Sequence, residues 1–286
     1  MLLRRVVQLR TTFAISPVPP VSVVFLRSRP LSTDSNNDSH EDFFKYTSGR
    51  WIHNEAQELA KRYHRFNVEA LKRAAAEAGG ANSVLAMRKL VEGRFNKAFL
   101  MTLDNGKEVV ARLPTSSAGP SHRVTASEVA TIDFVRSRLE IPAPRVLAWS
   151  SDTSTNPVES DYIIMEKAEG VELDEVWNGL TQDLKRGVVS ELVRIEKLYM
   201  KKMRGGYGSL YYRSDAEADK TRDLYVDGVR DEKFVLGPAT PTSYWRDGKA
   251  DMDSIDRGPC KFYFLQVWLL LNHLRGLDAF ISTHIR

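Results

Sequence analysis

Residues 87–114 read MRKLVEGRFNKAFLMTLDNGKEVVARLP, and their pattern decides the fold. They predict three consecutive strands, the first two joined by a short polar turn around Gly93 and the last two by Asn105-Gly106. Asn-Gly favours a two-residue type I′ turn, because both positions of that turn need positive φ angles. The third strand is centred on Arg112. The stretch therefore indicates an antiparallel sheet.

Further helices and strands surround this sheet. Asn67 is a suitable N-cap for a helix that Gly79-Gly80 would end. Apolar residues at helical spacing predict helices over 51–63, 68–78, 122–139 and 181–202. Short apolar runs predict strands over 146–149 and 162–165. Residues 203–258 show little periodicity, and no element is predicted there.

The chain is long and apolar enough for a large core, with 286 residues of which 42% are hydrophobic. Its formal net charge of +4 at pH 7 comes from the N-terminus, because residues 1–33 contain five arginines and no acidic residue. The remaining chain is close to neutral. This distribution argues against a nucleic-acid-binding surface.

Residues 1–33 have the composition of a mitochondrial presequence, with arginine but no lysine and several hydroxyl residues. We therefore expect import into mitochondria, with the matrix as the compartment; a disordered tail is the alternative. Pro17, Pro19 and Pro20 interrupt the apolar run, which argues against both a secretory signal and a transmembrane segment. The single cysteine, Cys260, excludes an internal disulfide and a thiolate zinc cluster.

Three features could carry binding chemistry, and the first is the turn EGRFNK at residues 92–97. Backbone amides near Gly93 could face an anion there without a Cβ in the way. Taken alone, this glycine is better explained as part of a plain turn.

The second feature is a pair of opposite charges. Glu128 falls within an apolar helical stripe formed by Val124, Ile132, Val135 and Leu139. Arg112 lies in an apolar strand. Each charge would be costly to bury alone, so we expect the two side chains to pair. The guanidinium could still donate to a phosphate, although a structural salt bridge without a ligand is the alternative.

The third feature is the segment DYIIMEKAEGVEL at residues 161–173, a buried strand that continues into an extended connector, a glycine and a helix. In a kinase-like fold, the backbone of such a connector can pair with an adenine edge. Otherwise it is a strand end with a solvated acidic loop.

The order of these motifs resembles a known family. EGRFNK, VVARLP, the helix with Glu128 and YIIMEKAEG follow one another as in the aminoglycoside-phosphotransferase branch of the protein-kinase-like fold. The chain is more closely similar to the fungal mitochondrial group called altered inheritance of mitochondria protein 9. GSLYY at 208–212 and KFVLGP at 233–238 look like further pieces of that group. The resemblance covers roughly residues 44–259 and implies an α+β fold with an antiparallel-sheet N-lobe and an incomplete helical C-lobe.

The resemblance also implies an ATP site. The hairpin residues Gly93, Arg94, Phe95 and Asn96 would cover the phosphates. Arg112 stands where the family has its strand-3 basic residue, and Glu128 would orient it. Met165, Glu166 and Ala168 would line the adenine end. Arginine in place of the more usual kinase lysine is a departure from the family pattern.

Transfer chemistry would need an H-x-D-x-x-x-x-N loop after the connector, with a further metal-binding aspartate downstream. The chain contains no complete loop of this kind. We therefore expect a phosphotransferase-like protein that is catalytically incomplete as given, with weak ATP binding, no Mg²⁺ ligands and an acceptor that the sequence does not identify. The alternative is a non-catalytic nucleotide-binding or interaction protein of the mitochondrion.

The expected organisation has five parts. They are a presequence (1–33), a linker with one helix (34–66), an N-lobe (67–165), a hinge with a partial C-lobe (166–259) and an atypical tail (260–286). The tail contains a strongly apolar run at 262–271 and changes character abruptly after Pro259. This change favours truncation of a longer kinase relative.

Sequencing of the cDNA tests the truncation. We expect the transcript to continue from near Gly258 into an H-x-D-x-x-x-x-N loop in some reading frame, because the composition changes there. A cDNA that ends at Arg286 without such a loop would contradict this expectation.

Overall fold

The computed structural model describes residues 40–260 except 94, 172 and 205. Residues 1–39, which include the predicted presequence, and residues 261–286 lie outside the described residues. Helices are α2 (Glu41–Phe44), α3 (Glu55–Arg62), α4 (Val68–Gly79), α5 (Arg123–Ser137), α6 (Leu173–Trp177) and α7 (Gln182–Lys202). Strands are β1 (Val84–Lys89), β2 (Asn96–Leu103), β3 (Glu108–Pro114), β4 (Val146–Ser150), β5 (Tyr162–Glu166), β6 (Met203–Arg204), β7 (Ser209–Tyr212), β8 (Arg222–Val226) and β9 (Val229–Gly237).

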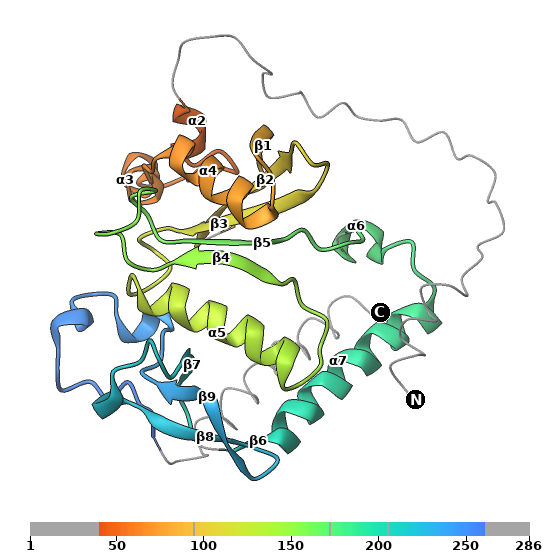
Figure 1. Cartoon of the computed structure of the whole chain (residues 1–286), viewed down its shortest axis with the longest axis vertical. Coiled ribbons are helices and arrows are strands. Elements are labelled where there is room, and N and C mark those ends of the chain that lie inside the picture. Colours follow the sequence, from red (N-terminus) through yellow and green to blue (C-terminus); the bar gives the residue numbers. More distant parts are fainter. Residues whose placement is uncertain (1–39, 94, 172, 205, 261–286) are drawn as a thin grey trace. The chain divides into compact units, whose positions relative to one another are not determined.

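The first sheet contains five antiparallel strands in the order β1-β2-β3-β5-β4. Its central strand is β3, where Arg112 pairs with Ala98 of β2 on one side and Ile163 of β5 on the other. The three strands expected from residues 87–114 are therefore present, and the α+β fold is confirmed. Figure 1 shows α4 on one face of this sheet and α5 on the other.

The β2–β3 hairpin forms, but its turn is not the expected type I′. The two strands leave a three-residue loop, because the amide of Leu103 donates to the carbonyl of Lys107 at 2.9 Å. Only Gly106 has a positive φ in this loop, at 79°. Asn105 instead donates its side-chain amide to the carbonyls of Gly79 and Gly80, at 3.1 and 3.0 Å. This side chain thus satisfies backbone acceptors at the end of α4.

Helix α4 begins and ends where the sequence predicts. The side chain of Asn67 accepts a hydrogen bond from the amide of Ala70 at 3.0 Å, and Gly80 takes the left-handed conformation after the last turn. The buried face of the helix, which includes Leu71, packs on the side of the sheet that carries the buried β3 residues Ala111 and Leu113. This contact makes the larger hydrophobic core.

Residues 203–258 form a second antiparallel sheet, in the order β6-β8-β9-β7, which the sequence did not predict. Helix α5 lies between the two sheets (Figure 1). On the second sheet, Phe134 of α5 packs edge-on against Phe234 of β9, with ring centroids 5.4 Å apart. Leu210 and Leu236 complete this smaller core.

The buried face of α5 is wider than the predicted stripe. Val124, Ile132 and Val135 are only half-buried. The buried residues are Thr125, Ala126, Ser127, Val129, Ala130 and Phe134. Since sheets cover the helix on two sides, small residues line most of the contact and allow close approach.

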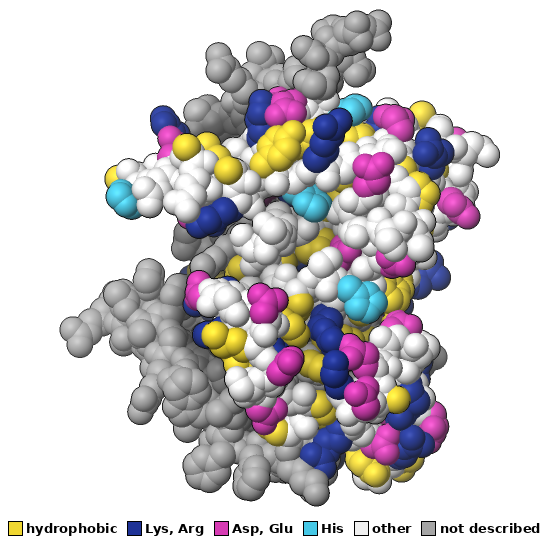
Figure 2. Space-filling view, turned by 90° about the vertical axis from the view of Figure 1, so that its left-hand side faces the viewer, with side chains coloured by type: hydrophobic (Ala, Val, Ile, Leu, Met, Phe, Trp, Pro, Cys, Tyr) yellow, Lys and Arg dark blue, Asp and Glu magenta, His cyan; other side chains and the backbone are white. Residues whose placement is uncertain are grey.

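Helix α7 is different, because none of its side chains in the described structure is buried. Leu198 and Tyr199 are half-buried against the smaller core, whereas the apolar residues Leu184 and Leu192 are exposed. Within the described part of the chain, no helix is long and apolar enough to cross a membrane. On the face drawn in Figure 2, basic and acidic side chains are interspersed.

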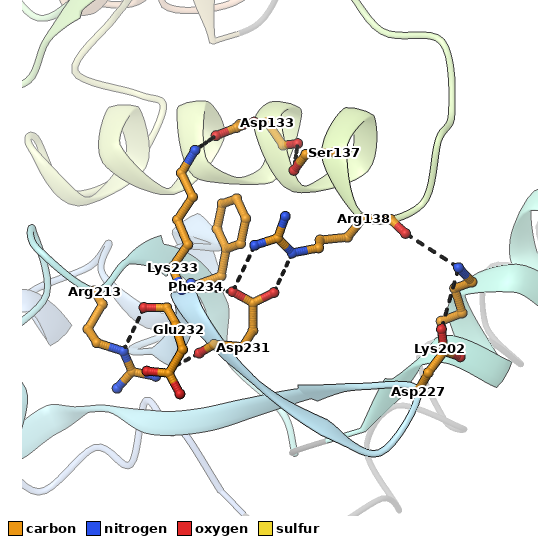
Figure 3. Close-up of polar contacts among 10 residues, drawn as sticks. All are labelled: Asp133, Ser137, Arg138, Lys202, Arg213, Asp227, Asp231, Glu232, Lys233 and Phe234. Atoms are coloured by element: carbon orange, nitrogen blue, oxygen red, sulfur yellow. Dashed lines mark hydrogen bonds and ion pairs between the residues drawn. The ribbon is translucent and has the colours of Figure 1, made fainter.

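A buried carboxylate joins the C-terminal end of α5 to the second sheet (Figure 3). Asp231 accepts hydrogen bonds from the guanidinium of Arg138 at 2.5 and 3.3 Å and from the amides of Lys233 and Phe234 at 2.8 and 3.0 Å. Lys233 also forms an ion pair with Asp133 of α5 at 2.6 Å. Burial alone would raise the pKa of Asp231, but these donors hold it below its ordinary value.

Replacement of this carboxylate by Asp231→Asn should change the pH dependence of stability. Since the pKa is lower in the folded state, the stabilisation is complete above the unfolded pKa of about 4 and is lost as pH falls through the folded pKa. We expect the variant to lose about 1–3 kcal/mol of unfolding free energy at pH 7. It should also lose less than the wild type on acidification, as measured by urea unfolding from pH 7 to pH 3.

Asp227→Asn is the matched control, because Asp227 is an exposed partner of Lys202 in the turn between β8 and β9. Its pH profile should match that of the wild type. An Asp231→Asn profile parallel to the wild type would contradict the role given to this carboxylate.

Candidate functional site

The expected ion pair forms between the centre of the first sheet and α5. Arg112 Nη1 lies 2.5 Å from Glu128 Oε1. Both side chains are about a quarter exposed, at 28% and 27%. The burial argument for pairing was therefore too strong, since neither charge is fully removed from water.

Because the pair is partly exposed, Arg112 can still contact an anion from solvent. A guanidinium has five N–H donors, and one contact with Glu128 leaves others for a second anion. Because the carboxylate also fixes the direction of the side chain, less conformational entropy remains to be lost on binding. Arg112 thus presents an oriented cation on the α5 side of the sheet.

The β1–β2 hairpin lies near the C-terminal end of β3. Asn96 pairs with Pro114, and the carbonyl of Phe95 accepts a hydrogen bond from the amide of Thr115 at 2.8 Å. Gly93 is exposed, and a Cβ added to it would meet no atom within 4 Å. Arg94 lies outside the described residues. The fold alone therefore does not require glycine at position 93.

The connector lies at the opposite end of β3, where Glu166 pairs with Val109. Met165 is buried against Val129 of α5, whereas Ala168 is exposed. The carboxylate of Glu166 is already engaged by Arg145, with Oε1 and Nε 3.1 Å apart. At the expected adenine end, Met165 is therefore part of the core, whereas Ala168 is open to solvent.

The register of β3 relates these groups to one another. From Val109 to Pro114 the strand spans about 17 Å, at about 3.3 Å per residue. Arg112 lies between the two ends, with the hairpin beyond one end and the connector beyond the other. The described members of the predicted set therefore lie on β3, on its neighbours β2, β5 and α5, or in the segments that adjoin β2 and β5.

A buried ion cluster behind the hairpin was not predicted. Lys97, which is completely buried, contacts Glu92 at 2.5 Å, and Lys89 contacts the other oxygen of Glu92 at 2.9 Å. A signal was available, because Lys97 alternates with Phe99 and Met101 on β2 and so had to face the core.

A cavity of about 230 Å³ opens beside the N-terminus of α5, and none of the predicted site residues lines it. Asp161 lines it and is buried; its Oδ2 accepts hydrogen bonds from the amide of His122 and from the hydroxyl of Thr125, at 2.9 and 3.2 Å. Its Oδ1 has no partner in the described structure. His64 contacts Ser160 at 2.6 Å, and burial lowers the pKa of its imidazole.

Two further points concern catalysis. Across the described ranges, no group of three or more His, Cys, Asp or Glu side chains could hold a metal ion. His40 is followed two residues on by Asp42, but Thr47 stands where the catalytic loop needs asparagine, and the segment precedes the first sheet. It is therefore not a catalytic loop.

Comparison with known proteins gives partial sequence matches. Two proteins from Aspergillus fumigatus strains, each called subtelomeric hrmA-associated cluster protein, are 42% identical over 173 residues, which is 60% of this chain and 32% of each relative. Altered inheritance of mitochondria protein 9 of Yarrowia lipolytica is 30% identical over 253 residues, covering 80% of this chain and 43% of the relative. The protein of the same name from Clavispora lusitaniae is 26% identical, with 87% and 49% covered.

Solved structures match only in part. Aminoglycoside phosphotransferase APH(4)-Ia gives a TM-score of 0.27 at 20% identity, covering 38% of this chain and 33% of that protein. The GDP and kanamycin complex of APH(2")-IIia gives a TM-score of 0.26 at 18% identity, with 37% and 31% covered. No family model matches the chain.

The chain spans between about a third and a half of the length of these sequence relatives. The similarity expected from its motifs is confirmed: this chain is related in sequence to the fungal proteins called altered inheritance of mitochondria protein 9.

Proposed function

We propose that this chain is a mitochondrial, kinase-like protein that binds ATP on the α5 side of its first sheet. The observation that carries the proposal is the ion pair between Arg112 and Glu128. An arginine fixed by a carboxylate, with part of its surface still in water, is suited to hold a phosphate by charge-assisted hydrogen bonds.

The rest of the nucleotide would follow β3. The connector residues Met165, Glu166 and Ala168 would take the adenine end, and the hairpin from Gly93 to Asn96 would take the phosphates. The two segments lie beyond opposite ends of the strand that carries Arg112, which supports this orientation.

The compartment is supported by two independent features. Relatives from several yeasts are named as mitochondrial proteins. Residues 1–33 have the arginine-rich, acid-free composition of a presequence, and the matrix is the compartment such a sequence addresses.

The proposed activity is nucleotide binding without phosphoryl transfer. Phosphoryl transfer needs a base to take the acceptor proton and side chains to hold Mg²⁺, and the complete loop that supplies them in the family is not in the sequence. The described residues are therefore suited to recognition of the nucleotide rather than to its reaction.

ATP binding can be tested by thermal unfolding of the purified chain. A ligand that binds only the folded state stabilises it by about 2.7 kcal/mol at a concentration of 100 Kd. We expect ATP to raise the unfolding midpoint of the wild type and to have little effect on Arg112→Ala, which removes the oriented cation.

Arg194→Ala is the control, because Arg194 also pairs with a glutamate, Glu191, but lies exposed on α7. Its response to ATP should equal that of the wild type. If ATP raises the unfolding midpoint of Arg112→Ala as much as that of the wild type, Arg112 does not contribute to ATP binding. No shift in the wild type would favour the alternative, a protein that acts through a partner without nucleotide.

Mitochondrial import can be tested with a fusion of residues 1–33 to a cytosolic reporter. We expect isolated, energised mitochondria to import the fusion and protect it from added protease, because the arginines respond to the membrane potential. Replacement of Arg4, Arg5 and Arg10 by glutamine should abolish import. Residues 34–66 fused to the same reporter serve as the control, and a protease-sensitive 1–33 fusion would contradict the assignment.

A further inference from the structure

A buried ion cluster stabilises the β1–β2 hairpin, which would cover the phosphates. Lys97 is completely buried and contacts Glu92 Oε1 at 2.5 Å, while Lys89 contacts Glu92 Oε2 at 2.9 Å. Lys89 ends β1, Lys97 belongs to β2, and Glu92 lies in the turn between them. The cluster therefore joins both strands of the hairpin to its turn.

An N-terminal strap, residues 42–48, completes this cluster. The amide of Thr47 donates to Glu92 Oε2 at 2.7 Å, and the hydroxyl of Ser48 accepts from the amide of Glu92 at 2.7 Å. The carbonyl of Lys45 accepts from the ammonium groups of both Lys97 and Lys89, at 2.9 and 2.6 Å. The strap thus binds both the side chain and the backbone of the residue that precedes Gly93.

The charges of the cluster explain why the strap is needed. One carboxylate faces two ammonium groups, and a buried ammonium without enough acceptors is strongly destabilising. Burial lowers the pKa of Lys97, and the contact with Glu92 opposes that change only in part. Burial would raise the pKa of Glu92, but hydrogen bonds from Lys97 and Lys89 outweigh it and hold the pKa below its ordinary value. The strap carbonyls supply the missing acceptors.

The cluster and the expected nucleotide lie on opposite faces of the sheet. Lys97 shares its face of β2 with the buried residues Phe99 and Met101, which pack toward α4. Arg112 lies on the α5 side, where it reaches Glu128. The side chains of the cluster therefore do not contact a nucleotide on the α5 side, and the hairpin backbone is the structural link between the two.

We propose that Ser48, Glu92 and Lys97 are positioning residues, which hold the hairpin amides in the conformation that receives the nucleotide phosphates. This inference rests on the proposed ATP site. It adds that the strap, which lies far from the hairpin in sequence, helps to shape that site. Gly93 itself has no side chain, and a Cβ added there would meet no atom within 4 Å.

The test compares ATP with adenosine, which lacks the phosphates. Ser48→Ala removes one hydrogen-bond acceptor, and we expect it to weaken ATP binding roughly fivefold, as the loss of one such bond predicts. Lys97→Met removes the buried cation and should weaken ATP binding more. Adenosine affinity should stay unchanged in both variants, because the connector that would take the adenine is not touched by the cluster.

Two further measurements make the outcome decisive. Hydrogen exchange of the amides at 91–96 should become faster in both variants without nucleotide. Lys72→Met, which breaks a surface Lys72–Glu69 pair on α4, is the control and should change neither binding nor exchange at the hairpin. If Lys97→Met does not fold, the ATP affinity and hairpin exchange of Ser48→Ala alone test the positioning role.

The possible failures are distinguishable. Equal loss of ATP and adenosine affinity would indicate general damage and overturn the positioning role, as would unchanged ATP affinity despite faster exchange. If the wild type binds neither ligand, the ATP site itself fails, and unchanged hairpin exchange in Ser48→Ala would show separately that the strap does not hold the turn.

Discussion

The contact of α5 with both sheets is the constraint on which the described structure depends. One side of the helix packs against β5 through Val129, and the other packs against β9 through Phe134. The helix therefore belongs to both hydrophobic cores. Its small residues allow the sheets to approach, and its position fixes Glu128 relative to the central strand.

Two ion pairs near the candidate site differ in burial, and the difference separates their roles. Arg112 and Glu128 keep about a quarter of their surfaces in water, so the arginine can exchange water for another anion. Lys97 is fully enclosed, and its hydrogen bonds are to Glu92 and to a backbone carbonyl. The first pair is suited to recognition of a ligand, and the second fixes local backbone geometry.

Local signals in the sequence were sufficient for the first sheet. The alternation in β2 and β3, the Asn67 cap and Gly80 are short-range features, and each has its expected structural consequence. The pairing of Arg112 with Glu128 was also predicted, although both side chains are more exposed than the argument from buried charges assumed. The second sheet could not be predicted, because β9 mixes exposed and buried residues without a period of two and its partners are short strands. The strap contacts link residues more than 40 positions apart, and a local sequence pattern cannot predict contacts between residues so far apart.

A buried carboxylate anchors each end of α5. One comes from the residue before β5 of the first sheet, and the other comes from β9 of the second sheet. Asp161, beside β5, accepts the amide at the start of the helix, and Asp231 of β9 holds Arg138 just after its last turn. A negative charge at the first end and a positive charge at the second both match the helix dipole. Sliding or rotation of α5 along its axis would break both anchors at once. The helix is therefore held in place between the two sheets at both of its ends.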